Sequence, residues 1–198
     1  MAGIKLTKNE LKKQKDSLKR FQRYLPTLLL KKQQLQMVIR QVEVQLEEIR
    51  KEREKLYGDF QRWINVFGED AGVENLIRVE AIHEETGNIA GLDIPVFKDM
   101  SFAETDYDLF YKPLWVDRGI DFLRQIAALD AKMEILKKQI DLLSEELRVT
   151  TQRVNLFEKV KIPETKENIR KIRIYLGDQQ TAAVVRGKIA KNKVAREA

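Results

Sequence analysis

The chain of 198 residues has no cysteine and little else that forms turns or compact cores: 9 glycines, 4 prolines and 8% aromatic residues. Without cysteine, disulfides and thiolate metal sites are excluded, and a lone histidine, His83, cannot build a histidine-based metal site. So few turn-forming residues predict long uninterrupted elements. With 34% charged residues, the composition is typical of an extended helical protein rather than of an enzyme with a deep core.

Long apolar segments are also missing. No run of about 18 apolar residues occurs, and no charged-then-apolar leader opens the chain. We therefore expect no direct membrane insertion and no secretion, which leaves the cytoplasm as the default location.

Charge is present, but it is unevenly distributed. Residues 1–32 hold ten lysines and arginines against two acids, whereas residues 69–108 hold eleven acids against two cations. One end of the sequence is basic and the middle is acidic.

The N-terminal third shows a sustained helical repeat, and only three of its positions are polar. A seven-residue apolar repeat of this length indicates the seam of a left-handed coiled coil. Pro26 should bend this helix without necessarily ending it. The seam positions are Leu11, Gln14, Leu18, Phe21, Leu25, Leu28, Lys32, Leu35, Ile39, Val42, Leu46, Ile49, Arg53, Leu56, Phe60, Trp63 and Phe67.

A second seam follows Pro113, a residue suited to the first turn of a helix. It keeps the same three-four stepping as far as Phe157, and the apolar residues then lie one place late, from Ile162 onward. This slip coincides with Pro163. The positions of the second seam are Trp115, Gly119, Phe122, Ile126, Leu129, Met133, Leu136, Ile140, Leu143, Leu147, Thr150, Val154 and Phe157, then Ile162, Ile169, Ile172 and Leu176.

The segment between the seams has β-branched and aliphatic residues on both sides of a polar stretch, residues 85–88, that contains glycine and asparagine. This pattern predicts a β-hairpin with strands at about 76–84 and 89–97 and a turn at 85–88. Pro95 has no N–H for a ladder and marks an edge. An isolated hairpin is only marginally stable, so it should pack on the coiled coil or on a partner.

These elements predict an all-α dominated fold, a long antiparallel two-helix coiled coil with a short middle region that contains the hairpin. The segments are an N-terminal helix (1–67), a middle region (68–112) with the hairpin at about 76–97, and a C-terminal helix (113–198). Antiparallel pairing puts both termini at one end, where the longer C-terminal helix should protrude as a basic tip.

Two short stretches of the sequence resemble catalytic motifs, but neither is complete. Gly187-Lys188 lacks the other residues of a phosphate loop, and His83-Glu84-Glu85 is followed by glycine where a zinc-protease helix needs histidine. Carboxylate pairs such as Glu47-Glu48 fall on solvated faces of the coiled coil. We expect no enzymatic activity and no cofactor or metal.

The basic N-terminal arm has four interpretations. It can be a solvated face, a nucleic-acid footprint, a membrane-surface helix or a tip held in an acidic protein cavity. The aromatic residues fall mainly on the seam, away from the lysines, so stacking platforms for single strands are missing. A coiled-coil scaffold or adaptor is the alternative function from these features, followed by a basic nucleic-acid-binding coiled coil.

Three blocks of the sequence resemble one family in the same order along the chain: LTKNELKKQKDSLKRFQRYLPTLLLKKQQLQ, RVEAIHEETGNIAGLDIPVF and RVNLFEKVKIPETKENIRKIRIYLGDQQ. The chain resembles the D subunit of the V-type ATPase or ATP synthase. The resemblance implies a non-catalytic central-stalk rotor subunit that transmits torque between a catalytic hexamer and a membrane rotor ring.

The implied partners are the A and B subunits of the hexamer, the F subunit on the side of the axle, and a funnel-shaped subunit that couples its base to the membrane ring. No nucleic acid is implied, and the location would be the cytoplasmic face of the membrane. We expect the hexamer to contact Lys5, Lys8, Lys12, Lys13, Arg186, Lys188, Lys191 and Lys193. We expect other stalk subunits to contact Ile82, Leu92, Ile94 and Val96 of the hairpin region.

The two prolines suggest one further expectation. Pro26 and Pro163 fall near each other if the arms pair antiparallel, and each removes a helical hydrogen bond. We expect them to mark a shared bend between the shaft and the basic tip.

Overall fold

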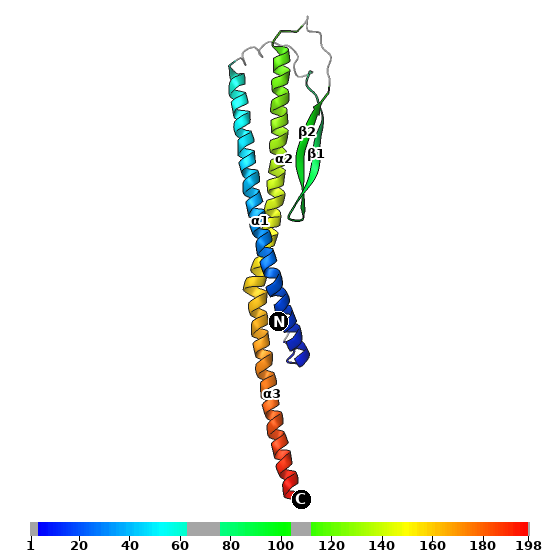
Figure 1. Ribbon diagram of the computed structural model, residues 1–198, viewed down its shortest axis with the longest axis vertical. Helices are drawn as coiled ribbons and strands as arrows, with labels where there is room; N and C mark the ends of the chain where they lie inside the picture. Colours follow the sequence, from blue (N-terminus) through cyan, green and yellow to red (C-terminus); the bar gives the residue numbers. More distant parts are fainter. Residues whose placement is uncertain (1–3, 63–75, 104–111, 198) are drawn as a thin grey trace. The chain divides into compact units, whose positions relative to one another are not determined.

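The computed structural model describes residues 4–62, 76–103 and 112–197. Most of them are helical, and a single antiparallel hairpin interrupts the helices (Figure 1). The predicted fold class is confirmed. The elements are α1 (Lys8–Gln61), β1 (Val79–Ile89), β2 (Leu92–Phe102), α2 (Val116–Asn155), the π-helical turn η3 (Leu156–Lys161) and α3 (Ile162–Glu197).

The chain forms two compact units. Unit 1 combines Met1–Lys32 with Val149–Ala198, and unit 2 is Gln33–Arg148. Both chain ends therefore belong to the same unit, as antiparallel pairing of the helices requires. The helices α1 and α2 each contribute residues to both units.

Unit 2 has a core of seam residues from α1 and α2. Leu35 and Leu143 are completely buried, and nearly every described position of the first seam is buried or half-buried. Close burial of a leucine side chain is worth roughly 1.5–3 kcal/mol, so this seam supplies much of the stability of the unit. The buried cluster consists of Leu35, Ile39, Val42, Ile49, Ile94, Leu136 and Leu143.

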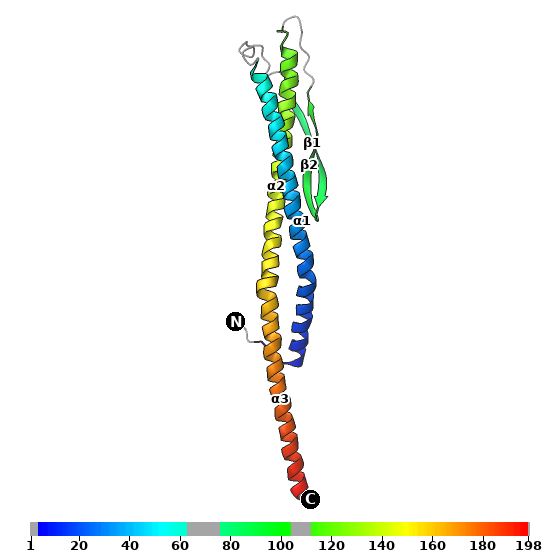
Figure 2. The ribbon, with the colours of Figure 1, turned by 60° about the vertical axis from the view of Figure 1, so that its left-hand side comes forward.

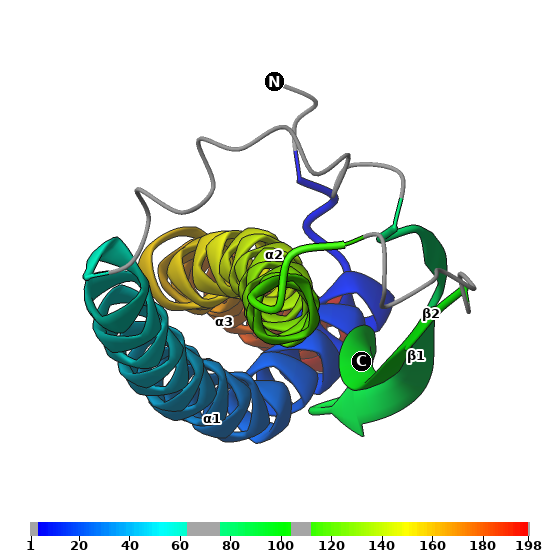
Figure 3. The same cartoon turned by 90° about the horizontal axis from the view of Figure 1, so that it is seen from above.

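The hairpin packs on one side of the pair formed by α1 and α2, as the end-on view shows (Figure 3). Ile94 is only 3% exposed and belongs to the buried cluster, while Leu92 packs against it. The side-chain amide of Gln139 on α2 donates a hydrogen bond to the carbonyl oxygen of Pro95. The helix pair thus supplies the support that an isolated hairpin lacks.

The turn of the hairpin does not lie at residues 85–88, and that prediction is wrong. Ile89 pairs with Leu92, so the loop is Ala90-Gly91, both with positive φ (53° and 80°), the backbone of a two-residue hairpin turn. The carbonyl oxygen of the Asn88 side chain accepts a hydrogen bond from the Gly91 N–H, and its amide donates to Asp93. Asn88 therefore braces the turn from the strand instead of forming it.

Gly87 has a different role from the one its place in a polar stretch suggests. It pairs with Ile94 inside the ladder, and a Cβ at this position would lie 2.9 Å from Cγ2 of Val96. No side chain fits there without a shift. The glycine is needed for close packing across the strands and not for a turn.

Polar and aromatic contacts join the helices of unit 2 away from the hairpin. The guanidinium of Arg53, a polar seam position, donates to both carboxylate oxygens of Asp130 on α2, with Nε at 2.6 Å from Oδ1. Phe60 and Phe122 stack with ring centroids 4.0 Å apart. The helix α2 begins at Val116, three residues after Pro113, whose carbonyl accepts the Val116 N–H. The expected seam residues Trp63 and Phe67 lie outside the described residues.

In unit 1, Thr7 caps the start of α1. Its hydroxyl accepts a hydrogen bond from the N–H of Glu10, as an N-cap threonine does. Phe21 of α1 contacts Phe157, with ring centroids 5.2 Å apart. Ile169 and Ile172 of α3 are buried, so the second seam resumes after the slip.

The slip itself is a π-helical turn. The N–H of Ile162 donates to the carbonyl of Phe157, five residues earlier, and these are the two seam positions between which the step is five instead of four. A π-turn adds one residue to a helix, which returns the apolar residues to one face. Pro163 follows at once, and it lacks the N–H that would continue the ladder.

Two helix-interior details complete unit 1. Thr165, only 4% exposed, donates its hydroxyl to the carbonyl of Lys161. Pro26 lies inside α1, which continues through it, and the Thr27 hydroxyl donates to the carbonyl of Tyr24. The helix thus survives the proline, as expected. The shared bend at Pro26 and Pro163 stays a prediction.

Candidate partner-binding surfaces

The predicted basic tip is exposed and belongs entirely to unit 1. Lys5 precedes α1, three lysines lie in its first two turns, and the other four cations lie near the end of α3. Beyond Leu176, every described side chain of α3 except Ala182 is exposed, and α3 continues past the beginning of α1 (Figure 2). The exposed cations are Lys5, Lys8, Lys12, Lys13, Arg186, Lys188, Lys191 and Lys193.

The tip combines these cations with apolar side chains that nothing in unit 1 covers. Val184, Val185, Ile189 and Val194 are each at least half exposed. None of the eight tip cations forms an ion pair with another described residue. The end of α3 therefore presents positive charge and apolar groups together.

The hairpin residues expected to contact partners divide into two pairs, and their contact with partners stays a prediction. Ile82 and Val96 are exposed and remain open to a partner. Ile94 is buried against α1 and α2, and Leu92 is half-buried against the same cluster. Leu92 and Ile94 are alternate residues of β2, and both pack against the seam of α1 and α2. Their side chains therefore hold the hairpin against the helix pair.

Exposed apolar residues form a further surface on α1 in unit 2, which the sequence patterns above did not predict. We call it the α1 outer face. Met37 and Val44 are seven residues apart, two places after the seam positions Leu35 and Val42, and each is 58% exposed. The spacing of these apolar residues was a signal that could have identified it. The face borders an open groove of about 790 Å³ lined by Gln33, Gln36, Met37, Arg40, Gln41, Val44, Gln45 and Glu48.

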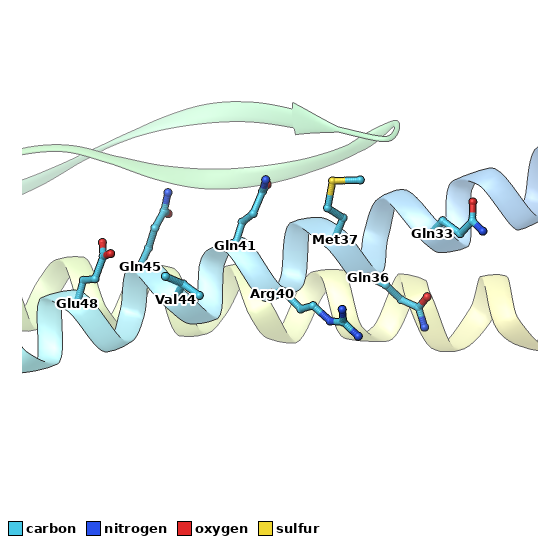
Figure 4. Close-up of a pocket in the computed structure, with 8 residues that line it drawn as sticks. All are labelled: Gln33, Gln36, Met37, Arg40, Gln41, Val44, Gln45 and Glu48. Carbon is cyan, nitrogen blue, oxygen red and sulfur yellow. The ribbon is translucent and has the colours of Figure 1, made fainter.

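The side chains of this face lie in two directions in Figure 4. Met37, Gln41 and Gln45 point to the side on which the hairpin lies, whereas Gln36 and Arg40 point away from it. Uncharged amides dominate, and Arg40 and Glu48 are the charged members. The surface therefore offers hydrogen bonds and apolar contacts rather than a strong field.

The described residues that resemble catalytic motifs are in unsuitable settings. Gly187-Lys188 lies within α3, not in a loop, and His83 is an exposed strand residue. Among the described residues, no three histidine or acidic side chains are grouped so that they could hold a metal ion. Hydrogen bonds from Arg148 hold the pKa of Glu145 below its ordinary value, so this carboxylate is a surface ion-pair partner.

Within the described part of the chain, the helices are all too polar or too short in apolar length to cross a membrane.

Comparisons with known proteins cover the whole chain. The family model of the ATP synthase D subunit matches residues 10–192. The V-type ATP synthase D subunit of Borreliella burgdorferi is 53% identical over 197 residues, which is 100% of this chain and 98% of that relative. The V-type ATP synthase D subunit of Chlamydia caviae is 35% identical over 96% of this chain and 93% of its own length, and that of Chlamydia trachomatis serovar A is 33% identical over 96% of each. The chain belongs to the ATP synthase D-subunit family.

Proposed function

We propose that this chain is the central-stalk rotor subunit of a V-type ATPase or ATP synthase, and that it transmits torque between the catalytic A/B hexamer and the membrane rotor ring. The observation that carries the proposal is the 53% identity to a V-type ATP synthase D subunit over the full length of both chains. The chain would be a non-catalytic component at the cytoplasmic face of the membrane.

The packing within each unit suits this role. Torque passes along a helix pair only if the helices resist sliding and unwinding, and interlocked seam side chains provide that resistance. In unit 2 the seam is reinforced by the Arg53–Asp130 pair and by the packed hairpin. These contacts suit a unit that holds its internal geometry under load.

The exposed surfaces suit two kinds of contact. A rotor must exchange its contacts with the hexamer repeatedly, and exposed charged side chains make weak contacts of about 0–1 kcal/mol each. We assign the hexamer contacts to the eight cations of the tip. We assign the F subunit to the α1 outer face, because Met37 and Val44 leave apolar surface exposed there, and other stalk partners to Ile82 and Val96.

Removal of the end of α3 tests the proposal. A variant that ends at Ala183 loses four of the tip cations together with Val184, Val185, Ile189 and Val194, but keeps all the buried seam residues. We expect it to fold, as circular dichroism would show, and to assemble with the other subunits, while ATP hydrolysis coupled to ion transport falls.

A matched control keeps the length of α3 and changes only the assigned side surface. The double variant Met37→Ser/Val44→Ser should weaken the copurification of the F subunit and leave the hexamer bound. If the hexamer assembled, hydrolysed ATP and rotated equally well in the complete absence of this chain, the rotor assignment would be wrong.

A further inference from the structure

Unit 1 contains a groove that the proposed tip contacts do not use. It lies between the N-terminal part of α1 and the first half of α3 and has a volume of about 540 Å³. Both helices contribute to it, so it exists only when they are paired. Its lining residues are Lys15, Leu18, Lys19 and Gln22 of α1, and Lys166, Ile169, Arg170, Arg173 and Ile174 of α3.

The floor and the rim of this groove differ in chemistry. Ile169 is buried and Leu18 is half-buried, so they form an apolar floor, and Ile174 is a 55% exposed apolar side chain at its edge. The remaining lining residues are five cations and one glutamine, with no carboxylate among them. An anion with an apolar side would match both parts.

The five groove cations have no carboxylate partner among the described residues. Elsewhere on the two helices charged residues do pair: on α1 Arg50 reaches Glu47 at 3.4 Å, and at the start of α3 Glu164 pairs with Lys161 of η3 at 3.3 Å. Like charges placed together on paired helices repel each other. Unit 1 therefore carries a local electrostatic cost that a bound anionic partner would remove.

The spacing of the cations indicates the shape of that partner. Lys166, Arg170 and Arg173 follow one another at four and three residues, so they form a row on one face of α3, and Lys15 and Lys19 form a shorter row on α1. From Lys166 to Arg173 the row spans about 10 Å, or two helical turns. Two parallel rows of charge on either side of an apolar floor match a helix with an apolar stripe flanked by acids.

We propose that this groove receives an acidic amphipathic helical segment of a partner protein. The inference rests on the proposed function in that the partner is a neighbouring subunit of the same complex. Its leucine or isoleucine side chains would lie on Leu18 and Ile169, and its carboxylates would pair with Lys19 and Arg170. Nucleic acid fits less well, because no aromatic side chain lines the groove for base stacking and a phosphate backbone leaves the apolar floor uncovered.

Site-specific photocrosslinking in the assembled complex tests this proposal. A benzophenone amino acid replaces Gln22, the uncharged lining residue, in the full chain, and the adduct is identified by mass spectrometry. We expect one protein adduct at a segment rich in aspartate and glutamate. The same amino acid at Gln152, an exposed residue of unit 1 outside the groove, should not label that segment.

Charge reversal adds a quantitative arm. Arg170→Glu should lower the yield of the Gln22 adduct about fivefold, because an attractive contact becomes a repulsive one. Lys171→Glu changes the net charge equally on the same helix but does not line the groove, and it should leave the yield unchanged. Arg170→Gln provides a milder variant with a smaller expected loss if Arg170→Glu disturbs folding.

The outcomes separate this inference from the rotor assignment. If the chain does not enter the complex at all, the proposed function fails. If the chain enters the complex but Gln22 labels nothing, labels lipid or nucleic acid, or labels a segment without acids, the groove proposal is wrong while the rotor assignment stands. An adduct yield that falls equally with Lys171→Glu would also overturn it, because the charge of the whole unit would then be responsible.

Discussion

Unit 2 and unit 1 use the same helical repeat for different purposes. Unit 2 adds a third element, the hairpin, to its helix pair and joins its helices by a charge pair that includes a polar seam residue. The elements described in unit 1 are all helices, and the cations of its groove and tip have no partners among the described residues. This contrast fits the proposals above, in which the uncovered cations of unit 1 contact other molecules.

The seams of the two units also differ in regularity. In unit 2 the three-four stepping of the seam keeps one phase through α1 and α2, whereas unit 1 contains the π-turn between Phe157 and Ile162, where the phase shifts by one residue. A π-turn weakens the helix locally because its hydrogen bonds and packing are less favourable than those of an α-helix. This turn lies in the unit whose helix pair has no packed hairpin to support it.

The largest expected difference between the units concerns cavity formation. Leu143→Ala in unit 2 should lower the free energy of unfolding by about 3–5 kcal/mol, and Ile172→Ala in unit 1 by about 2–3 kcal/mol, because the walls of a two-helix pair collapse more readily into the space. Both side chains are completely buried. Urea unfolding followed by circular dichroism gives the totals, and hydrogen exchange assigns the loss to each unit.

The neighbouring residue supplies the control for that comparison. Leu142 is 43% exposed, so Leu142→Ala should change stability by less than about 0.5 kcal/mol. An equal or larger loss for Ile172→Ala than for Leu143→Ala would break the proposed ranking of the two units.

Single-residue deletions in unit 1 have the next largest expected effect. Deletion of the exposed Val160 removes the extra residue of the π-turn, so the step from Phe157 to the next seam residue becomes four and Ile169 and Ile172 keep their face. Deletion of the exposed Lys171 instead moves Ile172 out of the seam. The second variant should be less stable than the first by about 2 kcal/mol or more.

Thermal and urea unfolding of the two deletion variants would measure this difference, and a crystal structure of the Val160 deletion should show continuous α-helix through this segment. Equal stability of the two variants would mean that the π-turn does not compensate the slip in the apolar repeat.

Part of this structure could be predicted from the sequence, and part could not. The heptad positions of both seams could be predicted because burial of a repeated apolar face is a local and additive signal. The one-residue slip was visible for the same reason, but its form was not: Pro163 suggested a bend, whereas the chain absorbs the extra residue in a π-turn. The choice depends on hydrogen bonds that the apolar pattern does not encode.

The hairpin shows the opposite case. Glu85–Asn88 has the composition of a turn, yet the turn is Ala90-Gly91, because the pairing of Gly87 with Ile94 and the packing of Ile94 on the helices fix the register. The surfaces for partners were predicted only in part. The basic tip could be predicted because its cations are clustered in the sequence. The groove could not, because it forms only when Lys19 and Arg170, which are distant in the sequence, line the same space.

The charge pair inside unit 2 should contribute less than the apolar contacts. A double-mutant cycle with Arg53→Ala and Asp130→Ala should give a coupling of about 0.5–1 kcal/mol, because the two side chains are 37% and 43% exposed and water screens them. Added salt should reduce the coupling. A coupling above about 2 kcal/mol would mean that the pair determines the alignment of the helices and does more than reinforce it.

The smallest effect expected concerns the surface pair at the edge of unit 2. Hydrogen bonds and charge from Arg148 hold the pKa of Glu145 below 4.5, its ordinary value. A carboxyl group whose pKa is lower in the folded state stabilises that state above its unfolded pKa, and this contribution disappears as pH falls through the folded pKa. Arg148→Ala should therefore raise the pKa of Glu145, which an NMR titration of its side-chain carbonyl would measure, while Lys132→Ala should leave it unchanged. Since both partners are more than half exposed, the effect of Arg148→Ala on the free energy of unfolding should be close to the error of measurement. A large loss of stability at acid pH would show instead that unit 2 depends on its surface charges as well as on its packed seam.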